Sequence, residues 1–201
     1  PFSTPSCRKI ISPNFLEAIN VKGFSLGLSI NKWIVLNLET STTNCSVSLS
    51  FENDLVDCIE QDSSNYSHSE NLHVFIKELL NKNNTEFNQL SAISVSRGPG
   101  SYTGLRIGLS AAKGLCYGLD IPLISISSLK ILANSVKFDG FTVATMDARR
   151  EEVYSCIYDP NLNVIREEKP EIINHKSFID ISKNNKLLFI GDGQFKCKEL
   201  I

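Results

Sequence analysis

The sequence predicts a layered α/β fold. Apolar runs of strand length come first, at 33–38, 45–51 and around Cys58 and Ile59; a helical stripe follows at 67–80; and strands then alternate with helices. The 201 residues suffice for one large domain or for two lobes, each with its own core. Composition is that of a globular protein, with 42% hydrophobic and 21% charged residues.

Three strands open the fold. Residues 33–38 are almost all apolar, which is typical of a central strand. In 45–51, apolar residues alternate with serines, so we expect a strand that is buried on one face only. Asn53 and Asp54 then turn the chain into a third strand through Cys58 and Ile59.

Helices then alternate with further strands along the sequence. Ser67 and Glu70 have the spacing of a capping box, and they precede an amphipathic stripe made of Leu72, Phe75, Ile76, Leu79 and Leu80. A short apolar strand at 92–95 leads through a glycine-rich turn into a second helix at 103–119. A strand at 121–126 and a helix at 127–136 complete the first lobe.

The chain divides into three parts in this interpretation. Residues 1–32 contain four basic residues and one acid without sustained periodicity, so we expect a leader or appended segment outside the fold. Residues 33–138 form the first lobe. Residues 139–201 form a second, incomplete lobe, with strands at 141–146, 153–158, 164–165 and 187–190 and the first turns of another helix at the end.

Charge and cysteines restrict the class of protein. The net charge of −2 provides no overall basic field, so nucleic acid binding by this chain alone is not indicated. Six cysteines without a C-x-x-C pair are typical of buried thiols in a reducing compartment, and they do not suggest a zinc site or disulfides. No apolar run reaches the ~18 residues of a membrane span. We expect a cytoplasmic protein, and the basic leader leaves an organelle open.

The glycine-rich turn is the first candidate site. Gly98, Pro99, Gly100 and Ser101 join a strand to a helix, where glycine can adopt positive φ and the first N–H groups of the helix can bind an anion. A strand-to-helix turn without any ligand has the same composition.

The second candidate site is a turn that carries acidic and hydroxyl side chains, and a pair of histidines is considered beside it as a metal site. Glu39, Thr40 and Ser41 follow a buried strand and could hold Mg²⁺ and phosphate; a solvated turn explains them equally well. Asp147 could act with them, but its neighbours Arg149 and Arg150 favour a surface turn there. His68 and His73 are five residues apart, which places them about 140° apart on a helix, so we do not expect a shared metal.

A ridge of small residues on the second helix is the third candidate. It comprises Gly104, Ile107, Ala111, Gly114 and Gly118, opposite the leucine stripe. Small side chains let another helix approach closely, either within this chain or in another subunit.

Five motifs together resemble one family. They are L-E-T-S-T at 38–42, H-S-E-N-L at 68–72, S-R-G-P-G-S-Y-T-G-L-R-I-G at 96–108, K-G-L at 113–115 and M-D-A-R-R-E-E-V-Y at 146–154. In this order they are similar to the TsaB family, also called YeaZ. The resemblance implies an actin-like, Hsp70-like ATPase fold of the ribonuclease H-like kind, with two related lobes of which the second is truncated.

The resemblance also implies a function and partners. TsaB is the non-catalytic partner of the metal-bearing, glycoprotease-like paralogue TsaD, and with a TsaE-like ATPase it supports threonylcarbamoylation of the adenosine beside the tRNA anticodon. Docking on TsaD would use the two helices, including His68 and Leu72, and tRNA would bind only through the complex. No cofactor is expected in this subunit, with Mg-ATP at or near the partner interface left open. A homodimer through the same helices is compatible with this role.

Two departures from the family pattern bear on the alternatives. The acid after the first strand is Glu39 where many relatives have Asp, and the two histidines are five apart rather than four. The rival interpretations are an ATP-dependent phosphotransferase or ATPase that uses Glu39, Thr40, Ser41 and Asp147, and a metallopeptidase.

Overall fold

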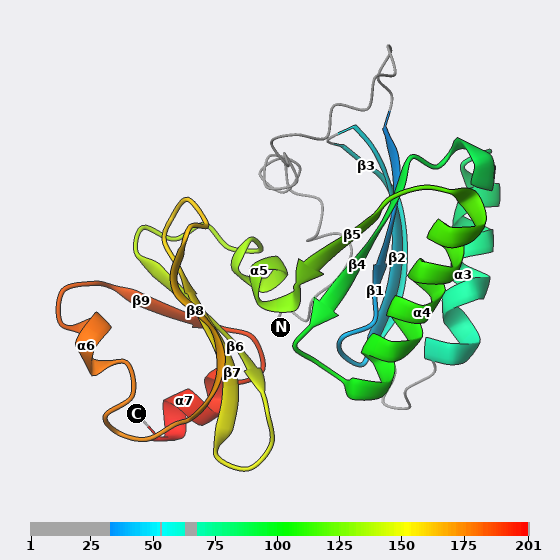
Figure 1. Cartoon of the computed structure of the whole chain (residues 1–201). Helices are drawn as coiled ribbons and strands as arrows, with labels where there is room; N and C mark the ends of the chain where they lie inside the picture. The colour runs from blue at the N-terminus through cyan, green and yellow to red at the C-terminus, as the bar shows by residue number, and fades with distance from the viewer. Residues whose placement is uncertain (1–32, 53, 63–67, 201) are drawn as a thin grey trace. The chain divides into compact units, whose positions relative to one another are not determined.

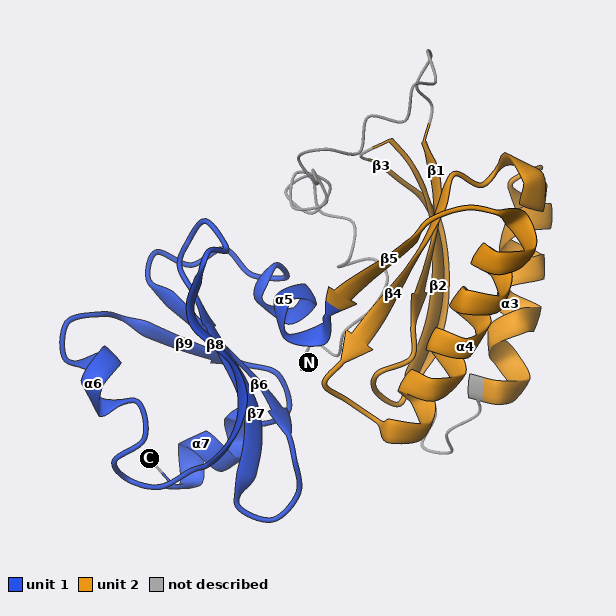
Figure 2. Cartoon of the chain, viewed as in Figure 1, with its two compact units in different colours: residues 1–4, 127–201 blue, residues 5–126 orange. Residues whose placement is uncertain are grey.

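The computed structural model describes residues 33–52, 54–62 and 68–200. The expected leader at 1–32 lies outside these residues. The chain divides into two compact units, one ending at Ile126 and the other continuing from Ser127 (Figure 2). The sequence predicts this boundary after residue 138, whereas the helix α5 (Ser128–Ala133) packs on the strands that follow it and is grouped with them.

The first unit is built on a five-stranded sheet in the order β3-β2-β1-β4-β5. Its strands are β1 (Ile34–Glu39), β2 (Asn44–Phe51), β3 (Asp54–Asp62), β4 (Ala92–Gly98) and β5 (Leu123–Ser127). The first three are antiparallel neighbours, whereas β4 runs parallel to β1. This arrangement confirms the three opening strands and places the ends of β1 and β4 side by side.

Two long helices, α3 (His68–Lys82) and α4 (Tyr102–Leu119), cover the same face of this sheet (Figure 1), and a short 3₁₀ helix, η1 (Phe87–Gln89), precedes β4. The leucine stripes of both helices pack on the apolar side chains of β1, β2 and β4. The N–H of Gly104 donates to the Ser101 hydroxyl, which caps the start of α4, and the left-handed Asp120 ends the helix. The expected capping box begins at Ser67, outside the described residues.

The opposite face of the sheet is polar and also buried. Ser46, Ser48 and Ser50 of β2 are at most 2% exposed, so the expectation of a half-buried strand is wrong. The amide of Asn37 donates to the hydroxyls of Ser48 and Ser50, and the Ser94 hydroxyl donates to the Asn37 carbonyl at 2.6 Å. Short side chains that satisfy one another's hydrogen bonds can be buried where isolated ones could not.

The second unit repeats the strand arrangement of the first. Its strands are β6 (Phe141–Asp147), β7 (Glu152–Tyr158), β8 (Val164–Ile172) and β9 (Leu187–Ile190), in the order β8-β7-β6-β9. β6, β7 and β8 are antiparallel neighbours, and β9 runs parallel to β6. The two related lobes that the resemblance implies are confirmed, and β8 is longer than the strand expected at residues 164–165.

Helices lie on both faces of the second sheet. Leu129 and Leu132 of α5 pack with Ala144 and Met146 on one face. Two short helices follow in the chain, α6 (Ile179–Ser182) and α7 (Gln194–Leu200), and their segment places Phe178 and Cys197 against the other face. The second unit thus has its own core, and α7 is the helix expected near the end of the chain.

Candidate functional site

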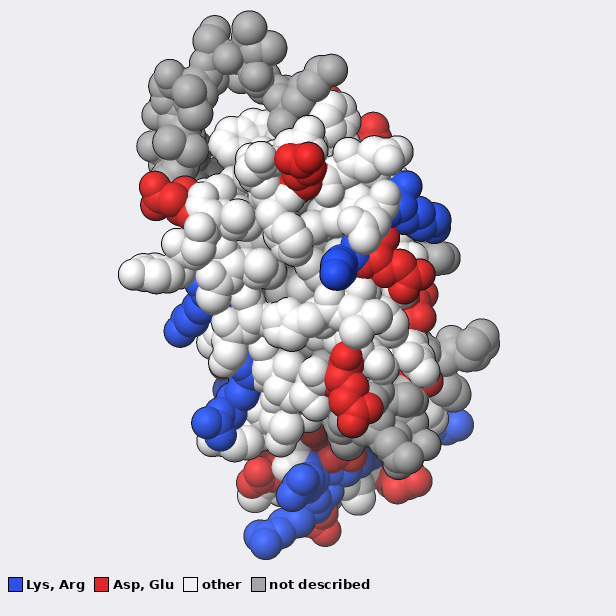
Figure 3. Space-filling view, turned by 90° about the vertical axis from the view of Figure 1, so that its right-hand side faces the viewer, with Lys and Arg blue, Asp and Glu red and all other residues white. Residues whose placement is uncertain are grey.

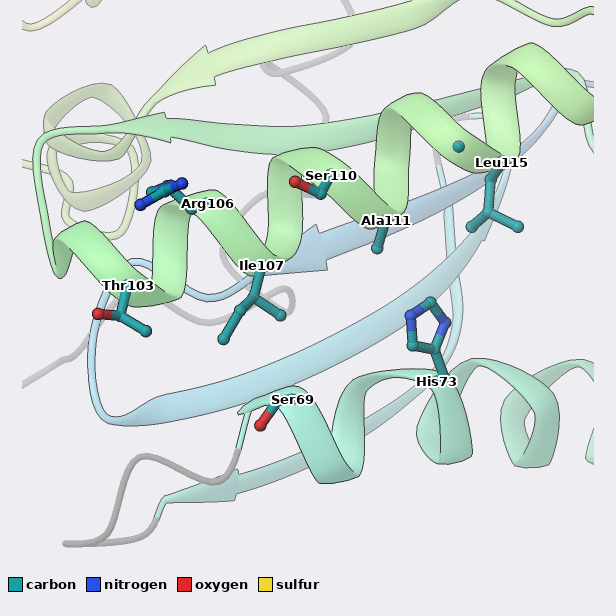
Figure 4. Close-up of a pocket in the computed structure, with 9 residues that line it drawn as sticks. Ser69, His73, Thr103, Arg106, Ile107, Ser110, Ala111 and Leu115 are labelled. Atoms are coloured by element: carbon teal, nitrogen blue, oxygen red, sulfur yellow. The ribbon is translucent and has the colours of Figure 1, made fainter.

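A groove of about 700 Å³ runs between α3 and α4 on the outer surface of the first unit (Figure 4). Its lining comprises Ser69, His73, Thr103, Arg106, Ile107, Ser110, Ala111, Gly114 and Leu115. In the close-up, Ile107, Ala111 and Leu115 point from α4 toward α3. These three side chains are only partly buried, so apolar surface remains accessible between the two helices.

Much of the predicted small-residue ridge lies at this groove. Ile107, Ala111 and Gly114 line it, and Gly114 and Gly118 are exposed. A Cβ at either glycine would have no atom within 4 Å. A partner helix could therefore approach this side of α4 closely, as small residues allow.

Two residues predicted at the partner interface lie elsewhere. Gly104 is buried on the sheet side of α4, where its carbonyl accepts a hydrogen bond of 2.8 Å from the Thr40 hydroxyl. Leu72 has no exposed surface and belongs to the core of its own unit, so it is not available to a partner. The side chain of His68 lies outside the described residues.

Sequence reasoning missed the polar lining of the groove. From the sequence, His73 on α3 is considered only as a possible metal ligand, and Thr103, Arg106 and Ser110 on α4 are not singled out. Thr103 and Ser110 are each separated from the ridge residue Ile107 by a helical spacing of three or four, which would have placed them next to it.

The surface over the two helices carries few charges. Figure 3 views this side and shows mostly uncharged side chains, with single Lys, Arg, Asp and Glu side chains spread between them and more charges toward the bottom of the view. Large apolar or aromatic side chains are exposed on both helices, namely Val74, Tyr102 and Tyr117. A groove in which Arg106 is accompanied mainly by uncharged side chains, on helices that expose aromatic residues, has the character of a protein interaction surface.

A buried carboxyl group lies beneath α4, at the end of β1. Oε1 of Glu39 accepts hydrogen bonds from the N–H of Ser41 at 2.7 Å and from the Ser96 hydroxyl at 2.8 Å. Burial raises the pKa of the Glu39 carboxyl, although these donors act in the opposite direction. Oε2 of Glu39 and Oγ of Ser41 have no hydrogen-bond partner among the described residues.

The glycine-rich turn packs directly on Ser41, the residue whose N–H donates to this carboxyl group. Gly98 and Gly100 have φ of 104° and 156°, and the Gly98–Pro99 peptide is cis. The N–H of Ser101 donates to the Ser41 carbonyl at 2.6 Å. A Cβ at Gly100 would stand 2.3 Å from the same Ser41 oxygen, so glycine is needed there for close contact.

The predicted nucleotide turn does not fit a phosphate site within this unit. Glu39 and Thr40 are completely buried and Ser41 is 1% exposed. α4 covers Thr40 so closely that a Cβ at Gly108 would lie 2.2 Å from its hydroxyl oxygen. Because the turn exposes almost no ligand atom to solvent, we derive no chemistry through Mg-ATP.

Asp147, the fourth member of that predicted set, lies in the second unit at the end of β6. Its carboxylate accepts hydrogen bonds from Lys196 Nζ at 2.7 Å and from the N–H of Arg149 at 2.5 Å. Partial burial raises the pKa of Asp147, but these two donors outweigh it and hold the pKa below its usual value. Its carboxylate therefore has a structural role in its own turn.

The described residues form neither a metal-binding cluster nor a membrane-spanning helix. In the ranges 33–52, 54–62 and 68–200, no three His, Cys, Asp or Glu side chains gather as metal ligands would. Cys45, Cys156 and Cys197 are buried free thiols, and Cys58 and Cys116 are half-buried ones. None of the helices in those ranges is long and apolar enough to cross a membrane.

Comparisons with known proteins agree on one family. A family profile described as "TsaD: tRNA N6-adenosine threonylcarbamoyltransferase" matches residues 62–196. The tRNA threonylcarbamoyladenosine biosynthesis protein TsaB of Bacillus subtilis is 36% identical over 67% of this chain and 61% of its own length. TsaB of Buchnera aphidicola subsp. Baizongia pistaciae is 30% identical over 79% of this chain and 75% of its own length. The chain thus spans less than two thirds of the Bacillus relative.

Solved structures show the same relationship. YeaZ from Pseudomonas aeruginosa superposes with a TM-score of 0.73 at 25% identity, over 84% of this chain and 80% of that one. The doubled strand order and this likeness define an actin-like, ribonuclease H-like protein with two related lobes. The chain belongs to the TsaB (YeaZ) family, which is related to TsaD.

Proposed function

We propose that this chain is a subunit of the assembly that forms threonylcarbamoyladenosine in tRNA. In this proposal it acts as a non-catalytic scaffold and activator, and it docks on a TsaD-like paralogue through the groove between α3 and α4. The names of the relatives support the pathway, and the groove supports the docking.

The open position at Gly114 is the observation that carries the docking proposal. In a helix that is covered by its own fold, a glycine faces neighbouring atoms, as Gly108 faces Thr40. Gly114 faces no atom within 4 Å, yet Ile107 and Ala111 beside it are apolar or small. Such a surface favours close packing of a helix from another molecule.

In this proposal, the remaining partners bind the assembled complex and not this chain alone. A TsaE-like ATPase would bind the assembled pair. The tRNA would also bind the pair, since this chain alone has a net charge of −2 and provides no overall basic field. In the absence of the paralogue, a second copy of the chain could occupy the same groove.

Light scattering coupled to size exclusion tests this proposal. The full chain is run alone and mixed with the TsaD paralogue of the same organism. A mixed peak of defined stoichiometry is expected. Separate elution of the two proteins, with the chain shown to be folded by circular dichroism, would refute the docking.

The ATPase alternative makes a different prediction. It requires stoichiometric ATP binding by the isolated chain, abolished by Glu39→Ala. The complete burial of Glu39 and Thr40 does not favour it.

A further inference from the structure

Two tyrosines and two cations form a narrow stripe along α4. Tyr102, Arg106, Lys113 and Tyr117 lie within about 60° of one another around the helix axis. Tyr102 is 74% exposed and Tyr117 is 93% exposed. Tyrosine is among the residues most often buried at protein interfaces, so two such rings on one helix indicate a contact that the isolated chain does not make.

The cations of this α4 stripe have no acidic partner. α4 contains no Asp or Glu, and in the described part of the chain neither Arg106 nor Lys113 forms an ion pair. The Arg106 guanidinium instead lies 5.2 Å from the centre of the Tyr102 ring and donates to its hydroxyl at 3.4 Å. Two positive charges therefore remain uncompensated on an otherwise weakly charged surface.

The α4 stripe faces outward and continues into the docking groove. The buried residues of α4, namely Gly104, Gly108 and Ala112, lie on the opposite side of the helix. Arg106 belongs to the stripe and also lines the groove. A helix seated along α4 would thus cover the groove and the stripe together.

We propose that the α4 stripe recognises an acidic helix of the docking partner. Arg106 and Lys113 are seven residues apart, which is two turns or about 10 Å. The matching element is a partner helix that runs along α4 and carries two carboxylates with the same seven-residue spacing. Tyr102 and Tyr117 supply the buried anchors at either end. This inference rests on the proposed function and adds the chemistry of the partner surface.

Charge reversal tests the inference. The double variant Arg106→Glu/Lys113→Glu is titrated with the TsaD paralogue, and we expect binding at least about tenfold weaker than wild type, because attraction becomes repulsion. Added salt should weaken the wild-type complex and strengthen that of the double variant. The matched control, Lys176→Glu/Lys183→Glu, makes the same change in charge on exposed residues of the second unit and should bind like wild type.

Each outcome has a distinct meaning. If the wild-type chain does not bind the paralogue, the proposed function fails. If wild type binds and the double variant binds equally well at every salt concentration, this inference alone fails. If the double variant binds the paralogue normally but the resulting complex loses affinity for tRNA, the stripe contacts RNA and the inference is overturned. Should the double variant not fold, Arg106→Gln/Lys113→Gln replaces it, with a smaller loss of affinity expected.

Discussion

Replacing Gly114 by leucine should weaken docking while stabilising the isolated chain. No atom lies within 4 Å of the position that a Cβ would take, so the new side chain meets open space in the free protein. Leucine is a better helix former than glycine, and the free energy of unfolding should rise by about 0.5–1 kcal/mol.

In the complex, the same side chain stands where a partner helix would pack. Closely packed helices have interaxial distances of about 8–10 Å, and overfilling such an interface costs about 1–3 kcal/mol. The dissociation constant should therefore rise about five- to 150-fold.

Two measurements check both halves of this prediction. Urea unfolding gives the stability of the isolated chain, and calorimetric titration with the TsaD paralogue gives the affinity. Gly114→Ala is the matched control, since it adds helix propensity with only one methyl group and should lose little affinity. Wild-type affinity for the leucine variant, together with the expected gain in stability, would refute docking over Gly114.

Three further predictions concern buried groups. Gly108→Ala should destabilise the chain by about 1–3 kcal/mol in urea unfolding, because its Cβ would stand 2.2 Å from the Thr40 hydroxyl oxygen; an unchanged midpoint would contradict this packing. Burial raises the pKa of Glu39 above 4.5, so folding favours the protonated form. Wild-type stability should therefore fall, relative to Glu39→Gln, as the pH rises above the ordinary carboxyl pKa, because the variant has no such proton to lose, and parallel pH profiles would exclude this cause. Burial raises the pKa of Cys45 and of Cys197 to about 11. Both thiols should react with a disulfide reagent at about pH 8 only after unfolding, and rapid reaction of the native chain would count against their burial.

Local patterns predicted most elements of the fold. The expected start of α4 differs from the observed one by a single residue. The start could be predicted so closely because a glycine-rich turn and a serine cap are strong local signals of a helix N-terminus. β2 shows where such reasoning stops. Its alternation of apolar residues and serines is typical of a half-buried strand, but Asn37 on the neighbouring strand satisfies the serines and lets both faces be buried. That partner lies on another strand, so the periodicity of β2 alone does not reveal it.

The candidate site was predicted less completely. Gly114 and Gly118 lie on the surface as expected, whereas Gly104 faces the sheet. A stripe of small residues does not indicate which of its members contact their own fold, because glycine suits close internal packing and close docking equally well. The exposed Tyr102 and Tyr117 have no signature in one sequence, since their exposure depends on the tertiary structure.

The contact between Gly108 and Thr40 has a consequence for the thermodynamics of association. α4 cannot shift along its axis without driving a side chain into Thr40, which also donates a hydrogen bond to the Gly104 carbonyl. The outer surface of the helix is therefore held in one register before any partner arrives. A surface that is already ordered loses little conformational entropy on binding, so more of the contact energy remains as affinity.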